Sequence, residues 1–224
     1  MITDLHVHTS EVSACSEICG EDVVKNYKDS PFDGIVITNH INGAYFGEKM
    51  SSGDWKKKID WYVDGYKRAA SVGEKIGLAV LFGCELCIAS TGSDFLLYGV
   101  TEDFLKEYTN LNMMSLPEVS TACRDGGVLL FQAHPFRNGM KISNPSLIDG
   151  VEVLNGHAGH DSRNDFAKLW AERFGLLMCA GSDYHHPGGH ARAGIVTEFP
   201  IEDEKALVSV LKSGNFTIYD NTKQ

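Results

Sequence analysis

Short apolar runs alternate along the chain with longer segments in which apolar and charged residues recur at a helical period. The short runs predict strands at 2–6, 34–38, 78–85, 95–100, 128–133, 151–154 and 176–180. The longer segments predict helices at 21–28, 55–76, 116–124, 162–174 and 203–212. Strand–helix alternation of this kind favours a parallel sheet covered by helices, either closed into a barrel or open.

Residue types at several segment ends support these boundaries. Ser115 precedes the helix at 116–124 with Glu118 three residues later, which is the spacing of a capping box. Gly175 and Gly214 stand where two other helices should end. The long Gly-rich loop 39–54 contains Tyr45 and Phe46 and is interpreted either as a lid over a site or as a surface excursion.

Length and composition indicate one globular domain spanning residues 1–224, with 43% hydrophobic residues to build a core. The formal charge is −10 and the densest basic stretch is only 56–58, so no extended nucleic-acid surface is evident. An acidic surface still permits an enzyme that handles a nucleotide or short oligonucleotide at a metal site, because bound cations reverse the local potential.

The six cysteines favour reduced thiols over disulfides. Cys84, Cys123 and Cys179 lie in or beside apolar runs, as small buried residues do. Cys84 and Cys87 form a C-x-x-C pair, but a continuing strand would place the two thiols on opposite faces. The chain begins without a leader-like segment, and its apolar runs are shorter than the roughly 20 residues of a membrane span. We therefore expect a cytoplasmic protein that does not contact a membrane.

Metal-ligating side chains follow five of the predicted apolar runs. They are His6 and His8, His40, Glu85, His134, and Asp183 and His185. Any one of them alone is more often a hydrogen-bonded loop residue than a ligand. That five apolar runs are each followed by such a residue is not expected by chance. Since the carboxyl ends of parallel strands meet at one face, we expect these side chains to form one site. Mixed imidazole and carboxylate ligands suit zinc, manganese or iron, and their number predicts two or three divalent cations.

The segments that carry these residues resemble, in order, the motifs of the PHP (polymerase and histidinol phosphatase) superfamily. They are 4–9, 37–40, 83–85, 133–137 and 181–185. The resemblance implies a distorted (β/α)7 barrel, similar to a TIM barrel, with its metal site at the C-terminal ends of the strands. It also implies that these side chains bind two or three metal ions, with Glu85 as a bridging carboxylate. Glu85 and His185 are the expected catalytic residues.

One departure from the superfamily pattern concerns the loop after His8, where members usually carry an Asp or His. This chain has Glu11 and Cys15 in that loop. Glu11 is the candidate replacement ligand, with Cys15 as the second choice. The third metal site depends on one of them.

The expected reaction is attack on phosphorus by a hydroxide that two cations share, since metal ions lower the pKa of bound water. Arg137, Arg163 and Arg192 are candidates to bind phosphate through the guanidinium fork, although each alone is more often a surface ion pair. Asn155 and His186 are further candidates for substrate contact. Two histidines near the start of the helix at 162–174 are assigned loop or capping roles, namely His157 and His160.

The leading functional hypothesis is a metal-dependent phosphomonoesterase acting on a small phosphorylated metabolite. An alternative is a phosphodiesterase or exonuclease for nucleotides or short oligonucleotides. A metalloamidohydrolase is less favoured, because such barrels generally place a Lys between their metals and Glu85 occupies that position here. A non-catalytic metal-binding barrel is the last alternative. The motifs are specific for the superfamily and not for the substrate, the metal or the oligomeric state.

Overall fold

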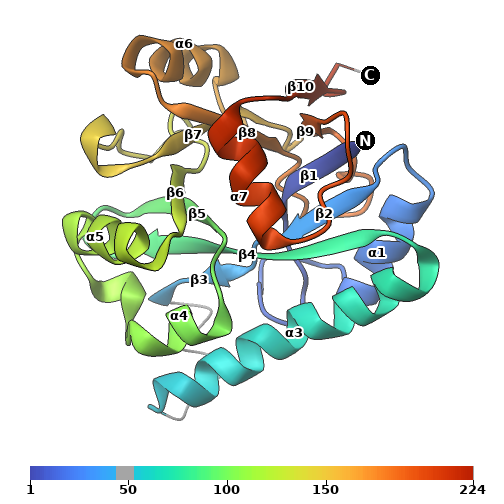
Figure 1. Cartoon of the computed structure of the whole chain (residues 1–224), viewed down its shortest axis with the longest axis horizontal. Coiled ribbons are helices and arrows are strands. Elements are labelled where there is room, and N and C mark those ends of the chain that lie inside the picture. Colours follow the sequence, from blue (N-terminus) through green and yellow to red (C-terminus); the bar gives the residue numbers. More distant parts are fainter. Residues whose placement is uncertain (44–52, 224) are drawn as a thin grey trace.

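The computed structural model describes residues 1–43 and 53–223 as a mixed α/β structure with a nearly closed, barrel-shaped sheet (Figure 1). Its strands are β1 (Ile2–Val7), β2 (Gly34–Ile37), β3 (His40–Ile41), β4 (Ala79–Ile88), β5 (Ser93–Tyr98), β6 (Leu129–Gln132), β7 (Gly150–Asn155), β8 (Leu177–Gly181), β9 (Ala193–Val196) and β10 (Thr217–Asp220). Its helices are α1 (Gly20–Lys28), α3 (Trp55–Ile76), α4 (Glu102–Glu107), α5 (Leu116–Gly126), α6 (Asn164–Phe174) and α7 (Glu204–Ser213), with short 3-10 turns at Leu111–Met113 and Pro145–Leu147. The loop residues Tyr45 and Phe46 lie outside the described residues.

The strand order is β10-β9-β1-β2-β4-β5-β6-β7-β8, and β3 pairs with the end of β4. The pairs β1–β2, β2–β4, β6–β7 and β7–β8 are parallel, as expected. The helices lie around the outside of this sheet, with α3 along one side and α6 at the periphery near β7 (Figure 1). This is the arrangement expected of a TIM-like barrel.

The sheet approaches closure where β8 meets β1. Tyr184, just beyond β8, forms a parallel bridge to Val7, and the His8 N–H donates to the Tyr184 carbonyl at 3.2 Å. The contact is tight: a Cβ on Gly181 would lie 2.5 Å from the backbone nitrogen of His6. The sheet therefore comes nearest to closure at the strand ends that carry the first and last predicted ligands.

The sheet departs from the expected all-parallel pattern at β5, which is antiparallel to both β4 and β6. The connection between β4 and β5 spans only 89–92, too short for a crossover, so the chain must reverse direction. The sequence predicted Glu85 at the end of a strand. Strand β4 instead continues to Ile88, so Glu85 lies inside it. The antiparallel strands β9 and β10 and the two-residue β3 were also not predicted.

The predicted helices are confirmed with small shifts. Helix α3 has the predicted bounds, and the capping box of Ser115 and Glu118 begins α5. Gly175 and Gly214 end α6 and α7 in the left-handed conformation. Helix α6 begins at Asn164 instead of residue 162, because Arg163 before it has a left-handed backbone. Helix α4 was not predicted.

All six cysteines are free thiols. Cys84 is buried and Cys87 is half-buried on the opposite face of β4, as the strand period predicted. Among the helices in residues 1–43 and 53–223, none is long and apolar enough to cross a membrane.

Candidate metal centre

The residues expected to bind metal come together at one end of the barrel. They form three overlapping groups in which the ligand atoms lie within 4.8 Å of one another: His8, His40 and His185; His6, Glu85 and His134; and His6, His8 and Asp183. These side chains are buried, except that His40 is partly exposed. Five separate segments of the chain thus deliver their ligands to one cluster.

Glu85 lies at the centre of this cluster. Its Oε2 atom is 3.4 Å from His6 Nε2, 3.2 Å from His8 Nε2 and 3.0 Å from His40 Nδ1. Its Oε1 atom is 3.1 Å from His134 Nε2. One carboxylate therefore faces four imidazoles, which is the geometry that a bridging ligand needs.

Asp183 is the second buried carboxylate of the cluster. Its Oδ1 atom is 3.4 Å from His6 Nε2 and 3.5 Å from His8 Nε2. Its Oδ2 atom accepts a 2.6 Å hydrogen bond from Arg137. One oxygen thus faces the imidazoles while the other is held by the guanidinium.

Three of the imidazoles are oriented by hydrogen bonds at Nδ1. His6 Nδ1 donates to Glu152 at 2.8 Å, and His185 Nδ1 donates to the Asp183 carbonyl at 2.9 Å. His8 Nδ1 lies 3.3 Å from Ser13 Oγ, whose own proton is given to a neighbouring amide oxygen. Donation at Nδ1 leaves the Nε2 lone pair free to bind a cation, as is usual for metal-binding histidines.

Two residues of the cluster have an unusual backbone. The backbone angle φ is +29° at His134 and +51° at Asp183, values that residues other than glycine rarely adopt. Such strain persists only where the surrounding structure holds it, and it is concentrated at functional sites. Here the Glu152 carboxylate accepts the His134 N–H at 2.9 Å and fixes that turn.

The charges in the cluster compensate one another. Burial alone would raise the pKa of Glu85, but His40 and His6 outweigh it and hold the pKa well below the usual range. Burial would lower the pKa of His6, whereas Asp183, Glu152 and Glu85 raise it well above 6.5. Burial and the nearby His8 lower the pKa of His185 to about 3. The cluster therefore holds fixed negative charge and needs cations, either protons or metals, to balance it.

The donor set fits divalent transition-metal ions. Buried His6 Nε2, His8 Nε2, Glu85 Oε2 and His134 Nδ1 have no hydrogen-bond partner among the described residues. Leaving buried polar atoms unpaired is costly, and a cation bound by these atoms removes that cost. Imidazole and carboxylate donors are those that zinc, manganese and iron prefer.

The two candidates for the extra ligand lie in different places. Glu11 accepts hydrogen bonds from the Gly20 N–H at 2.9 and 3.0 Å, at the start of α1, and belongs to none of the three ligand groups. Cys15 lies beside His40 and lines the metal cavity. The structure thus brings Cys15, rather than Glu11, to the cluster, because helix α1 engages the Glu11 carboxylate.

The predicted substrate-contact residues also lie in different parts of the structure. Arg137 and Asn155 lie at the cluster, joined by a 2.9 Å hydrogen bond, and each contacts Asp183. Arg163 instead donates to the Phe136 carbonyl, and Arg192 donates to the carbonyls of Gly156 and Thr222.

Arg163 and Arg192 thus link loops to one another and do not line the metal cavity, so their binding of phosphate stays a prediction. His186 lies at the rim of the metal cavity, half-exposed beside Glu17.

Sequence reasoning missed several residues of the cavity. Asp94 lines it because β5 runs antiparallel and starts at the end of the barrel where the parallel strands finish. His157 and His160, expected in loop roles, also line it, with ring centroids 4.6 Å apart. The hairpin turn at 89–92 was the one signal that could have placed Asp94 there.

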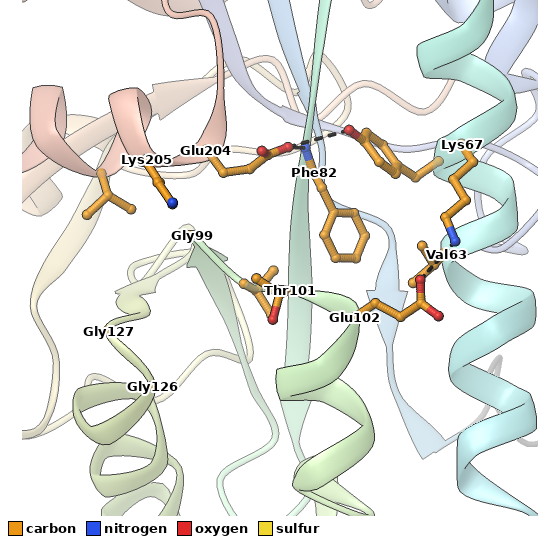
Figure 2. A pocket seen from close by; sticks show the side chains of 13 residues that line it. Val63, Lys67, Phe82, Gly99, Thr101, Glu102, Gly126, Gly127, Glu204 and Lys205 are labelled. Atoms are coloured by element: carbon orange, nitrogen blue, oxygen red, sulfur yellow. Dashed lines mark hydrogen bonds and ion pairs between the residues drawn. The ribbon is translucent and has the colours of Figure 1, made fainter.

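The metal cavity has a volume of about 340 Å³, room for a small ligand. A larger cavity of about 580 Å³ lies elsewhere, between α3, α4 and α7. Figure 2 shows that its polar groups bond to one another: Glu204 accepts from the Phe82 N–H, and Lys67 pairs with Glu102. Its lining is otherwise mainly apolar and holds no cluster of metal ligands, so we assign the chemistry to the smaller cavity.

Comparison with known proteins agrees with this fold. Residues 161–216 match the family described as PHP-associated. A search by sequence finds no matching curated protein. The structure is similar to a two-domain protein from Bacteroides vulgatus that contains a predicted PHP-like metal-dependent phosphoesterase, with TM-score 0.70 and 18% identity. That alignment covers 98% of this chain and 64% of the other, so the chain spans less than two thirds of that relative.

Two further structures share the fold. One is a candidate metal-dependent phosphoesterase from Bifidobacterium adolescentis, with TM-score 0.58, 16% identity and coverage of 94% of this chain and 95% of that one. The other is the lesion-specific endonuclease Q from Pyrococcus furiosus, with TM-score 0.62, 14% identity and coverage of 97% and 57%. Residues 161–216 therefore match the PHP-associated family, and the chain as a whole shares the fold of these PHP-like structures.

Proposed function

We propose that the chain is a metal-dependent hydrolase of phosphate monoesters whose organic part is small and uncharged. The observation that carries this proposal is the buried cluster around Glu85, where one carboxylate faces four imidazoles beside Arg137 in a cavity of about 340 Å³. Relatives of the same fold are described as metal-dependent phosphoesterases, which supports the same class of reaction here.

Bound divalent cations supply two things at such a site: they lower the pKa of water and they neutralise phosphoryl oxygens. The chain's own residues provide the rest. Glu85 and Asp183 would hold two cations close together, with His6 and His8 contacting both carboxylates. Arg137, which is fixed by Asp183 and Asn155, would orient the phosphoryl group at the wall of the cavity.

The metals are proposed as two cations of zinc, manganese or iron, with a third position beside His40 and His185. Cys15 is the nearest candidate to complete that third position, since it lies beside His40. A thiolate ligand would favour a soft cation there, zinc above the others.

The surroundings of the cavity favour an uncharged organic group. Among the residues that line it, Arg137 is the one permanent cation, and Asp183 already balances its charge. Burial lowers the pKa of His157 to about 4, and burial also lowers the pKa of His160, so both rings are neutral near pH 7. His157 Nδ1 accepts the Gly159 N–H at 3.0 Å, which leaves Nε2–H as a donor suited to a hydroxyl or a leaving oxygen.

A phosphodiesterase is the second candidate. It is favoured by the shared fold with endonuclease Q, one structure of which contains a duplex with an abasic lesion at the active site. Against it stand the formal charge of −10 and the shortage of unpaired cations around the cavity.

A cytoplasmic location is also proposed, supported by the six free thiols.

The test combines metal analysis of the purified chain with hydrolysis of p-nitrophenyl phosphate, bis-p-nitrophenyl phosphate and sugar phosphates. We expect at least two transition-metal ions per chain and turnover of monoesters. His134→Ala should lose metal and activity, while His190→Ala, which changes a histidine outside the three ligand groups, should retain both. Absence of metal, or full activity in His134→Ala, would overturn the proposal. Turnover of the diester alone would favour the second candidate.

A further inference from the structure

Helix α6 exposes an unusual concentration of large apolar side chains. Phe166 is 52% exposed, Leu169 is 61% exposed and Phe174 is 55% exposed, all within a single helix of 11 residues. Trp170, which is half-buried, stands edge-on to Phe174 at 6.5 Å. Phe166, Leu169 and Trp170 lie within about 100° of one another around the helix axis, and we call these three residues the α6 face; Phe174 lies about 140° from Leu169 and is not part of it. Figure 1 shows α6 at the periphery of the molecule, where its outer side is open.

Within the α6 face, Trp170 packs partly against the core, whereas Leu169 is 61% exposed. The helix packs inward through Ala167 and Ala171, its two buried residues. Leu169 is two residues from each of them, about 200° around the helix axis, and so points directly outward. Soluble monomers rarely expose large contiguous apolar patches, and such patches usually mark an interaction site.

We infer that the α6 face binds the same face of a second copy of this chain, with the two α6 helices antiparallel about a twofold axis through Leu169. The charged residues beside Leu169 favour a second copy of the chain as the partner and an antiparallel arrangement of the two helices. Asp165 and Arg173 lie four residues before and after Leu169, about 6 Å along the axis on either side of it.

An antiparallel twofold pair brings Asp165 of each copy opposite the partner's Arg173, giving two ion pairs around a central Leu169 contact. A parallel pair would instead place like charges together. The face is therefore complementary to itself, as a twofold interface requires.

The size of the helix limits the expected affinity of the dimer. A helix of this length extends about 16 Å and covers less area than the ~800 Å² per partner of a standard stable interface. The dimer should therefore be weak, associating at micromolar rather than nanomolar concentration.

The interface would lie close to the metal centre without contributing to it. Phe136, two residues after His134, packs against Phe166 and Trp170 with ring centroids 6.0 Å away in each case. Self-association would cover the outer side of this aromatic group. The inference rests on α6 alone and stands whether or not the chain hydrolyses phosphate esters.

Sedimentation equilibrium of the full chain, from about 5 to about 500 µM, tests the inference over the range of a weak interface. The weight-average mass should rise with concentration from 24.6 kDa toward twice that value. Leu169→Asp should remain at the monomer mass throughout. Phe199→Asp is the matched control, because Phe199 is 71% exposed outside α6 and its change should leave the association intact. Unchanged circular dichroism would verify that both variants are folded.

Charge reversal then tests the antiparallel register. Asp165→Arg and Arg173→Asp should each weaken association at least tenfold, and the double variant should restore it. A chain that stays monomeric at every concentration would overturn the inference. So would equal losses in Leu169→Asp and Phe199→Asp, or a double charge reversal that fails to recover association.

Discussion

At the scale of single residues, Glu152 is the buried group that connects two ligands of the metal centre. Its carboxylate accepts from His6 Nδ1 through one oxygen and from the His134 N–H through the other. The same side chain therefore fixes the ring orientation of one ligand and the strained backbone of another. Groups placed behind ligands in this way commonly change metal affinity by about 10- to 100-fold when they are altered.

Glu152→Gln should accordingly weaken metal binding by about 10- to 100-fold while the fold is retained. Glutamine keeps the size of the side chain, but its amide nitrogen cannot accept a hydrogen bond, so one of the two contacts is lost. Competition with a chromophoric chelator would measure the affinity. Glu172→Gln, an exposed change on α6, is the matched control, and equal affinities in the two variants would contradict the role assigned to Glu152.

Cys15 and Glu11 offer a second prediction at this scale. Because Cys15 lies beside His40 whereas Glu11 is bound at the start of α1, we expect the thiol to complete the third metal position. The cobalt-substituted protein should then show a thiolate-to-cobalt charge-transfer band in the near ultraviolet. Cys15→Ser should lose this band and Glu11→Gln should keep it. A spectrum without a sulfur band, or one lost in the Glu11 variant, would refute the assignment.

At the scale of elements, the close contact of β8 with β1 controls where the first ligands stand. A Cβ at Gly181 would lie 2.5 Å from the His6 backbone nitrogen, a distance that side chains do not tolerate. Backbone atoms cannot rotate away as a side chain end can, so the strands themselves would have to separate. The barrel closure and the position of His6 thus depend on one small residue.

Gly181→Ala should therefore lower the free energy of unfolding by about 1–3 kcal/mol, the usual cost of overpacking, and should reduce the bound metal. Gly53→Ala provides the control, since a Cβ there meets nothing within 4 Å. Urea unfolding and metal analysis of both variants give the two readouts. Unchanged stability in Gly181→Ala would contradict this close packing of β8 against β1.

The elements also explain what the sequence could and could not predict. Helix α3 and the ends of α5, α6 and α7 follow from local signals, namely helical period, caps and glycines, and these predictions are confirmed. The reversal at β5 depends on a four-residue turn within an apolar stretch, where periodicity does not report strand direction. Asp94 was missed for that reason.

The ligand residues were accessible to sequence reasoning because each follows or lies within an apolar run, and strands of a barrel converge. Residues carried by loops have no such signal. His157 and His160 reach the cavity through an irregular segment, and Arg163 and Arg192 are drawn away by backbone carbonyls that no pattern identifies. Long-range hydrogen bonds of this kind are decided by the assembled fold.

At the scale of the whole molecule, the charge of the metal centre links metal binding to global stability. Glu85 and Asp183 are buried carboxylates whose pKa values are held well below normal, so both remain charged over the neutral range. Without metal, protonated imidazoles balance them: the pKa of His6 and that of His40 lie well above 6.5 because of nearby carboxylates, despite burial. Protons and metal ions are alternative counter-charges for the same site.

This competition predicts that stability depends on pH more steeply in the metal-free protein than in the metal-bound protein. A histidine whose folded pKa is raised stabilises the fold fully below its unfolded pKa near 6.5 and loses that contribution as pH rises through the folded value. The metal-free protein should thus become less stable from pH 7 to pH 9. Metal binding instead strengthens as the ligands lose protons and offsets this loss, so the stability of the metal-bound protein should stay nearly constant over the same interval.

The difference in stability between the two forms should widen accordingly, and it amounts to about 4 kcal/mol where free metal reaches 1,000 times its dissociation constant. Thermal unfolding at pH 7, 8 and 9, after chelation and after metal is restored, measures both slopes. His134→Ala, which removes one ligand, should narrow this difference, and His190→Ala should leave it unchanged. Parallel slopes in the two forms would mean that protons and metals do not compete for this cluster, and that its buried carboxylates are balanced in another way.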